Sequence, residues 1–252
     1  MPAREKVILS WSGGKDSAMA LYELRRSDRY EVVALLTTVA AEYDRVSHHG
    51  VRASLLAAQA EAVGLPLEQL AIAVTSPHPC RTDHGDDVVM QEYERLMTEA
   101  MLRSKSQGVT AVAFGDIFLE QLRAYRESRL AQVGMRGVFP IWQRDTRELV
   151  ETFVDLGFRA YLTCVDSQKL GEAFAGRALD RDLLQDLPAD VDPCGEHGEY
   201  HSFVWDGPIF REPVHVRVGE VVLRDVRYFA DLLPAASPWM AAGDTLKGEP
   251  VC

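Results

Sequence analysis

The amino-acid sequence predicts an α/β fold, in which a parallel sheet with helices on both faces precedes a smaller C-terminal α+β domain. Short apolar runs alternate with helical patterns over about the first half of the chain, and a glycine pair joins the first run to the first helical pattern. Later segments alternate apolar and polar residues, as antiparallel strands do. Because β-α units wind into a parallel sheet, we expect ligands at the carboxyl ends of its strands.

The expected elements follow in chain order. In the first region we expect strands at residues 7–11, 32–38, 70–74 and 110–114, and helices at 17–26, 51–63, 86–107 and 119–132. Next come a short apolar strand at 137–142, a helix at 146–156, a strand at 158–165, and antiparallel strands within 200–205 and 214–226. Residues 183–192 are acidic and interrupted by proline. We place a domain boundary near Pro140, giving domains at 1–140 and 141–233 and a flexible tail at 234–252.

Composition narrows the class of protein. The formal net charge of −11 over 252 residues argues against broad attraction to nucleic acid or to anionic membranes, although a local basic groove remains open. No apolar run approaches the roughly twenty residues that a membrane helix needs. The four cysteines are far apart, no signal peptide is recognisable, and we therefore expect a soluble protein of the reducing cytoplasm.

The stretch Ser12, Gly13, Gly14, Lys15, Asp16 and Ser17 is the most informative in the chain. It follows an apolar strand and opens a helical pattern, so its backbone N–H groups and the positive helix end can point at one anion. Lys15 adds a mobile positive charge. The spacing differs from the Walker A pattern, which argues against a GTPase or kinase. The alternative is an ordinary strand-to-helix turn with a surface lysine.

A second polar stretch lies late in the chain. Glu196, Glu199 and His201 crowd around two glycines just before a strand. Such groups can bind Mg²⁺, orient an amine nucleophile or accept its proton. On composition alone, a polar turn leading into a strand is an equal alternative.

These motifs together resemble a known family. The first stretch resembles the PP-loop of ATP pyrophosphatases, which split ATP between its α and β phosphates and activate a substrate as an adenylate. The order of this loop, Phe114-Gly115-Asp116-Ile117, Pro140-Ile141-Trp142 and the late motif Gly-Glu-His-Gly-Glu-Tyr-His-Ser resembles the diphthine–ammonia ligase family of PP-loop ATP pyrophosphatases. The resemblance covers residues 7–210. Residues 41–52 look like those of a shorter, bacterial-type branch.

The resemblance implies a HUP-type Rossmann-like domain that binds ATP with Mg²⁺. In the archetypal reaction the diphthine carboxylate of elongation factor 2 is adenylated and then joined to ammonia, which releases AMP and pyrophosphate. Carried over by motif, the loop residues 12–17 would hold the phosphates, with Gly115 and Asp116 beside the nucleotide. Lys15, Glu196, Glu199 and His201 would be catalytic, and Asp16 is the candidate Mg²⁺ ligand. The acyl substrate, a small molecule or a protein side chain, stays open, as does the choice between ammonia and an amine.

Other residues carry weaker hypotheses. His49 and Arg52, after the second strand, and Arg126, on a helix with Arg123 and Arg129, are expected to contact substrate; solvated helix faces are the alternative. A cysteine nucleophile or sulfur carrier at Cys194 is a minority hypothesis, since no cysteine lies near it in sequence. The region of His78, Cys80 and His84 has too few ligands for a zinc site.

Three rival functions remain. They are a tRNA-modifying PP-loop enzyme, a nucleotide-binding protein without turnover, and an ATP hydrolase without an acceptor. Salt-dependent tRNA binding would support the first of these. Both a monomer and a homodimer are compatible with the sequence.

Overall fold

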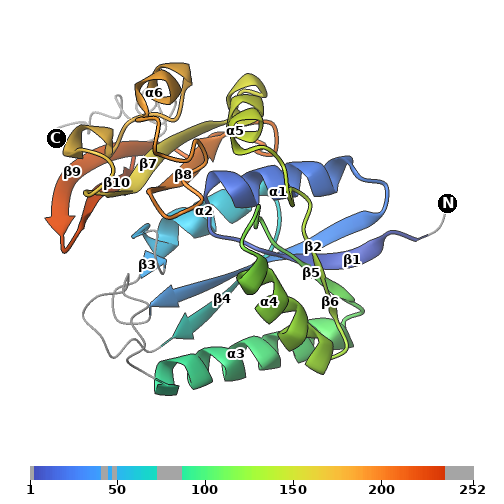
Figure 1. The fold of residues 1–252 in the computed structure, drawn as a ribbon. Helices are drawn as coiled ribbons and strands as arrows, with labels where there is room; N and C mark the ends of the chain where they lie inside the picture. The colour runs from blue at the N-terminus through green and yellow to red at the C-terminus, as the bar shows by residue number, and fades with distance from the viewer. Residues whose placement is uncertain (1–2, 41–44, 47–49, 73–86, 236–252) are drawn as a thin grey trace, which may run out of the picture.

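The computed structural model describes residues 3–40, 45–46, 50–72 and 87–235, and two sheets organise this part of the chain (Figure 1). The larger sheet contains five parallel strands in the order β4-β2-β1-β5-β6. Its strands are β1 (Glu5–Ser10), β2 (Tyr30–Ala40), β4 (Leu67–Ile72), β5 (Ala111–Ala113) and β6 (Arg136–Val138). A short strand, β3 (Arg45–Val46), pairs antiparallel with the end of β2. The predicted α/β fold class is confirmed.

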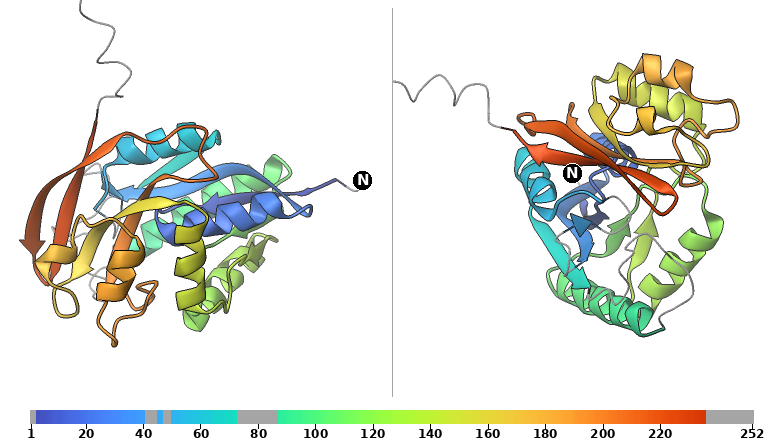
Figure 2. Two further views of the ribbon diagram at one scale, coloured as in Figure 1. Left: turned by 90° about the horizontal axis from the view of Figure 1, so that it is seen from above. Right: turned by 90° about the vertical axis from the view of Figure 1, so that its left-hand side faces the viewer.

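Four helices belong to this sheet, two on each face. They are α1 (Lys15–Arg26), α2 (Ala53–Val63), α3 (Asp87–Ser106) and α4 (Glu120–Gln132). Figures 1 and 2 show α3 and α4 on one face and α1 and α2 on the other. Gly64 ends α2 in a left-handed conformation, with φ at +75°, and its N–H bonds back to the last turn.

The second sheet is antiparallel throughout, in the order β8-β7-β10-β9. Its strands are β7 (Arg159–Asp166), β8 (Tyr200–Asp206), β9 (Val216–Arg224) and β10 (Arg227–Pro234). Helix α5 (Thr146–Asp155) precedes it, and η1 (Glu172–Phe174) and α6 (Arg181–Asp186) lie between β7 and β8 in sequence. Helices α1 and α2 lie between the two sheets (Figure 1).

Two apolar clusters fill the spaces between these layers. The larger one joins residues from β1, α1 and α2 to residues from α5, β7, β8 and β10, so the two sheets share one core. The smaller one lies under α3 and α4, where Ile8 and Val112 of the sheet meet Met101 and Leu130. No helix of the described ranges combines the length and the apolar character needed to cross a membrane. The shared core fixes β8 beside the amino-terminal end of α1.

The structure differs from the sequence prediction in several details. The strand expected at 137–142 ends at Val138, and Pro140 to Trp142 form a turn in which the Trp142 N–H donates to the Phe139 carbonyl at 3.3 Å. Proline has no N–H for a strand ladder, which explains the early end. Helix α6 and strand β10 had not been predicted. The Asp180 side chain starts α6 by accepting the Leu183 N–H at 2.8 Å.

Candidate active site

The candidate active site is built around the glycine loop, residues 12–17, which connects β1 to α1. Gly14 is the N-cap residue of α1, and no side chain caps the helix from that position. The positive end of the helix therefore faces the loop, with Asp16 as the acidic residue of its first turn. The Ser17 hydroxyl donates to the Gly14 carbonyl at 2.9 Å, and the Gly14 N–H donates to the Ser12 hydroxyl at 3.3 Å. This arrangement suits an anionic ligand.

At two positions, Gly13 and Gly115, the backbone lies so close to other atoms of the protein that a side chain would collide with them. Gly13 has φ at +76°, and a Cβ there would lie 2.5 Å from atoms of Gln59 and Leu56. A Cβ on Gly115, which follows β5, would lie 2.8 Å from the Asp16 carbonyl group. Only glycine fits at either place. The segment after β5 consequently lies directly against the first turn of α1, whereas the family resemblance implied only that Gly115 and Asp116 lie beside the nucleotide.

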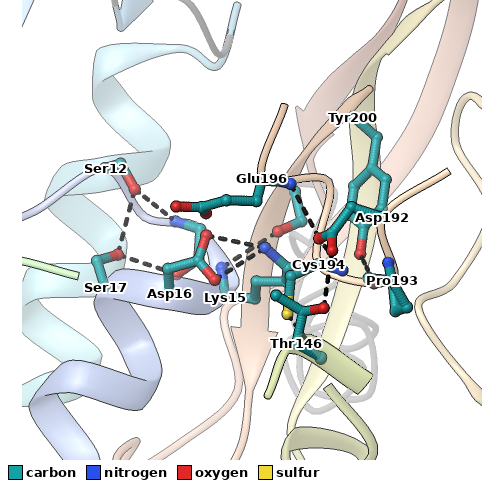
Figure 3. A network of polar contacts seen from close by, with 12 residues as sticks. Ser12, Lys15, Asp16, Ser17, Thr146, Asp192, Pro193, Cys194, Glu196 and Tyr200 are labelled. Atoms are coloured by element: carbon teal, nitrogen blue, oxygen red, sulfur yellow. Dashed lines mark hydrogen bonds and ion pairs between the residues drawn. The ribbon is translucent and has the colours of Figure 1, made fainter. Parts of the chain in front are cut away.

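Lys15 is charged and almost fully buried. Its Nζ lies 2.8 Å from both carboxylate oxygens of Asp16 and 5.4 Å from the centre of the Tyr200 ring (Figure 3). Burial alone would lower the pKa of Lys15, but the charge and hydrogen bond of Asp16 and smaller contributions from other neighbours together raise the pKa above its ordinary value. Lys15 is thus a permanent cation at the loop, with the Asp16 carboxylate as its counterion.

Asp116 and Arg126 form a second ion pair beside the loop. Arg126 Nη1 lies 2.7 and 2.6 Å from the two Asp116 oxygens, and its guanidinium lies 4.3 Å from the Phe114 ring centre. Burial raises the pKa of Asp116, and Arg126 partly offsets this. Arg126, which the sequence assigned to substrate, is therefore occupied in holding Asp116 in the described structure.

The loop of residues 192–199 faces the glycine loop from the C-terminal region, and two acids hold its shape. Glu199 is buried, and its two oxygens accept the N–H groups of Asp192 at 3.1 Å and His197 at 2.9 Å. One oxygen of Asp192 accepts the N–H groups of Cys194 at 2.8 Å and Glu196 at 3.1 Å. The Glu199 carboxylate therefore faces the inside of its own loop.

Glu196 is the carboxylate of this loop that approaches the glycine loop. Figure 3 shows its side chain extending toward Asp16, and its Oε1 accepts the Phe118 N–H at 3.2 Å. Burial raises the pKa of Glu196, and the negative charge of Asp16 adds to the effect. A partly buried carboxylate that has a raised pKa and lies beside the glycine loop is suited to accept a proton.

The third residue of the predicted trio, His201, lies elsewhere. It belongs to β8, where side chains alternate between the two faces of the strand. The neighbouring Ser202 faces α1, because its hydroxyl accepts the Lys15 N–H at 3.1 Å. His201 therefore lies on the opposite face of β8 from the residue that contacts the glycine loop.

The remaining residues that the sequence suggested for substrate or metal binding are as follows. Arg52, at the start of α2, forms an ion pair with Asp231 of β10 at 2.6 Å. His49 lies outside the described residues, as do His78, Cys80 and His84. The described residues contain no group of three or more His, Cys, Asp or Glu side chains arranged to hold a metal ion.

Cys194 has the character of a structural thiol. It is buried, its Sγ donates to the Thr146 carbonyl at 3.1 Å, and burial raises its pKa to about 12. A thiol of this kind is protonated near neutral pH and is a poor nucleophile. The sulfur-carrier hypothesis therefore loses its support.

Sequence reasoning missed Gln59, Ser202 and Val204, which attach other elements to the glycine loop. Gln59 is fully buried in α2 and donates from Nε2 to the Gly13 carbonyl at 2.9 Å. The Val204 N–H donates to the same carbonyl at 2.9 Å. A lone glutamine among the alanines and leucines of α2 was the visible sign for Gln59. The two β8 residues gave no sign, because their contacts join distant parts of the chain, 187 positions apart for Lys15 and Ser202.

Two family models match the chain. The model described as the diphthamide synthase N-terminal domain matches residues 5–137, and the diphthamide synthase C-terminal domain matches residues 145–233. Proteins named diphthine–ammonia ligase are similar to it. The one from Danio rerio is 28% identical over 89% of this chain and 91% of its own, and the one from Bos taurus is 27% identical over 87% and 85%. The one from Schizosaccharomyces pombe is 29% identical over 86% of this chain and 37% of its own.

Proposed function

Because the chain belongs to the diphthamide synthase family and is an ATP-dependent ligase, we propose that it transfers AMP from ATP to a substrate carboxylate and then forms an amide. The carboxylate oxygen attacks the α-phosphorus and pyrophosphate leaves. Ammonia or an amine then attacks the acyl carbon, loses a proton, and displaces AMP. Diphthine is the substrate class that the names of the relatives suggest.

One observation carries this proposal. The amino-terminal end of α1 and the buried Lys15 cation, from the start of the chain, lie beside the Glu196 carboxylate, from the C-terminal region. The loop N–H groups and Lys15 would stabilise the negative charge that develops on the departing pyrophosphate. Within this scheme residues 1–140 bind the nucleotide and residues 141–233 face the acyl group and the nucleophile.

Glu196 is our candidate for the general base. Its raised pKa makes the carboxylate a better proton acceptor than an exposed glutamate, and it lies on the glycine-loop side of its own loop. Glu199 would support this placement through its two backbone contacts. His201 stays a candidate for the acyl side, on the other face of β8.

Magnesium is part of the proposal. The carboxylate oxygens of Asp16, about a third exposed beside the glycine loop, fit the hard oxygen ligands that Mg²⁺ prefers. Asp16 is the residue that would hold the ion, together with the phosphates of ATP. The ion would supply positive charge against the polyphosphate, and Lys15 would then exchange its Asp16 contact for a phosphate contact.

The test follows the products of ATP in the presence of diphthine-bearing protein, other carboxylates, and ammonia or amines. We expect AMP and pyrophosphate in equal amounts, together with an amide product. Formation of ADP and phosphate would contradict the proposed chemistry. AMP without an acyl product would favour plain hydrolysis, and tight ATP binding without AMP would favour a nucleotide-binding protein without turnover.

A further inference from the structure

Gln59 carries a hydrogen-bond arrangement that nothing in the proposed chemistry uses. Its side chain is fully buried in α2, with Oε1 accepting the Trp11 indole N–H at 3.0 Å. Its Nε2 donates to the Gly13 carbonyl at 2.9 Å and to the Val204 carbonyl at 2.5 Å. Because an indole N–H can only donate, Trp11 fixes which end of the amide carries the oxygen. Both amide hydrogens therefore point at backbone carbonyls.

These contacts determine the direction of one peptide group in the glycine loop. The Gly13 carbonyl accepts from Gln59 Nε2 and from the Val204 N–H, both at 2.9 Å. In a trans peptide the carbonyl and the following N–H point in opposite directions. The Gly14 N–H consequently points away from Gln59, toward Ser12 and the side of the loop where the ligand would lie.

A peptide between two glycines needs such external support. Gly13, with φ at +76°, has no Cβ to restrict it, and Gly14 has none either. If the peptide turned over, the Gly13 carbonyl oxygen would face the ligand side in place of the Gly14 N–H. An acceptor would then replace a donor against an anionic phosphate, which is repulsive.

We propose that Gln59 is a positioning residue for polyphosphate binding, which holds the Gly13–Gly14 peptide with the Gly14 N–H facing the phosphates. Gln59 does not touch the ligand and acts only through this peptide. The inference rests on the proposed function, because it requires ATP on the glycine loop.

The test compares ATP with adenosine, which lacks phosphates, by isothermal titration calorimetry. Gln59→Met keeps the length of the side chain and removes both donors. We expect the affinity for ATP to fall about tenfold, the size of one hydrogen bond to a charged group, while the affinity for adenosine stays within about twofold of the wild type. An unchanged ratio of the two affinities would overturn the inference. Wild-type protein that does not prefer ATP to adenosine would instead overturn the proposed function.

Two variants serve as controls. Trp11→Phe removes the indole N–H but leaves both Gln59 donor bonds, so it should lower stability and leave the ATP-to-adenosine ratio unchanged. A fall in this ratio equal to that of Gln59→Met would overturn the role of the donor bonds. Gln107→Met makes the same change at an exposed position and should leave both affinities unchanged.

A measurement on the wild-type protein covers the case in which Gln59→Met does not fold. Amide hydrogen exchange of Gly14 should slow about tenfold with ATP, because the Gly14 N–H would exchange its 3.3 Å contact with the Ser12 hydroxyl for a hydrogen bond to a charged group, and it should not slow with adenosine. Exchange at Gly14 that ATP leaves unaltered would overturn the inference.

Discussion

At the scale of single residues, the site places one positive and two negative side chains close to one another: Lys15, Asp16 and Glu196. The buried Lys15 ammonium is neutralised by the partly exposed Asp16 carboxylate, and Glu196 adds a carboxylate whose pKa is raised by burial. Removing the Asp16 carboxylate would leave the buried Lys15 charge uncompensated. Substitutions of these residues should therefore separate effects on chemistry from effects on stability.

Lys15→Gln should depress turnover more than nucleotide binding. The variant keeps a donor of similar length and loses the charge that would stabilise the leaving pyrophosphate. We expect the rate of pyrophosphate release to fall about 10²-fold, the lower end of the range seen when one transition-state donor is removed, because glutamine keeps a neutral donor. The matched control is Lys6→Gln on the exposed side of β1, which should keep the wild-type rate. A wild-type rate in Lys15→Gln would contradict the role of the lysine.

Glu196→Gln should lower activity and raise stability. Because Glu196 is the candidate base, loss of its carboxylate should reduce the rate of amide formation about 10²-fold or more. Because burial raises its pKa, the folded protein binds this proton more readily than the unfolded chain does, and stability falls as the pH rises from the ordinary glutamate value through the raised pKa. Glutamine does not ionise, so the variant should not lose stability in this way as the pH rises.

Thermal unfolding of both proteins at pH 4 and pH 8 checks the stability part. The melting temperature of Glu196→Gln should exceed that of the wild type at the higher pH, and the difference should shrink at the lower pH. Glu199→Gln is the contrasting variant: it turns an amide toward two backbone N–H donors and should destabilise at pH 8. A Glu196→Gln protein less stable than wild type at pH 8 would contradict this account.

At the scale of elements, close contacts between backbones decide where the loops lie. The segment after β5 touches the first turn of α1 only because Gly115 has no side chain. The sequence shows a Gly-Asp pair after a strand, and topology then predicts its position at the carboxyl edge of the sheet. The distance to Asp16 could not be predicted, since it depends on how far β5 and α1 are staggered.

Gly115→Ala should therefore damage both stability and nucleotide binding. Its Cβ would lie 2.8 Å from the Asp16 carbonyl carbon and oxygen, so the first turn of α1 must move. We expect a loss of about 1–3 kcal/mol in the free energy of unfolding, together with weaker ATP binding. Urea denaturation and titration calorimetry measure the two effects.

Gly171→Ala is the matched control for this substitution. Gly171 has no atom within 4 Å of an added Cβ and no positive φ, and its change should be close to neutral. Equal stability losses in the two alanine variants would contradict the steric explanation.

At the scale of the whole molecule, the two sheets behave as parts of one core. One apolar cluster runs from Val7 in β1 to Leu232 in β10, and the Arg52–Asp231 ion pair joins α2 to β10. Sequence reasoning predicted the parallel sheet and the antiparallel sheet separately, because alternation is a local property. Their mutual packing is not local, and for that reason the contacts of β8 with the glycine loop were not foreseen.

The shared core predicts a single cooperative unfolding transition. Differential scanning calorimetry should give one peak, with a calorimetric enthalpy close to the van't Hoff enthalpy. Two resolved peaks, one for each sheet, would contradict the shared core.

The long reach of the β8 contacts has a consequence for the newly made chain. The Ser202 hydroxyl meets the Lys15 N–H across 187 positions of sequence, and such distant pairings form late because their loop-closure entropy must be overcome first. During synthesis the amino-terminal third emerges long before β8 exists. A ribosome-bound fragment that ends before β8 therefore lacks the Ser202 and Val204 contacts with the glycine loop, and we expect such a fragment to bind ATP more weakly than the full chain.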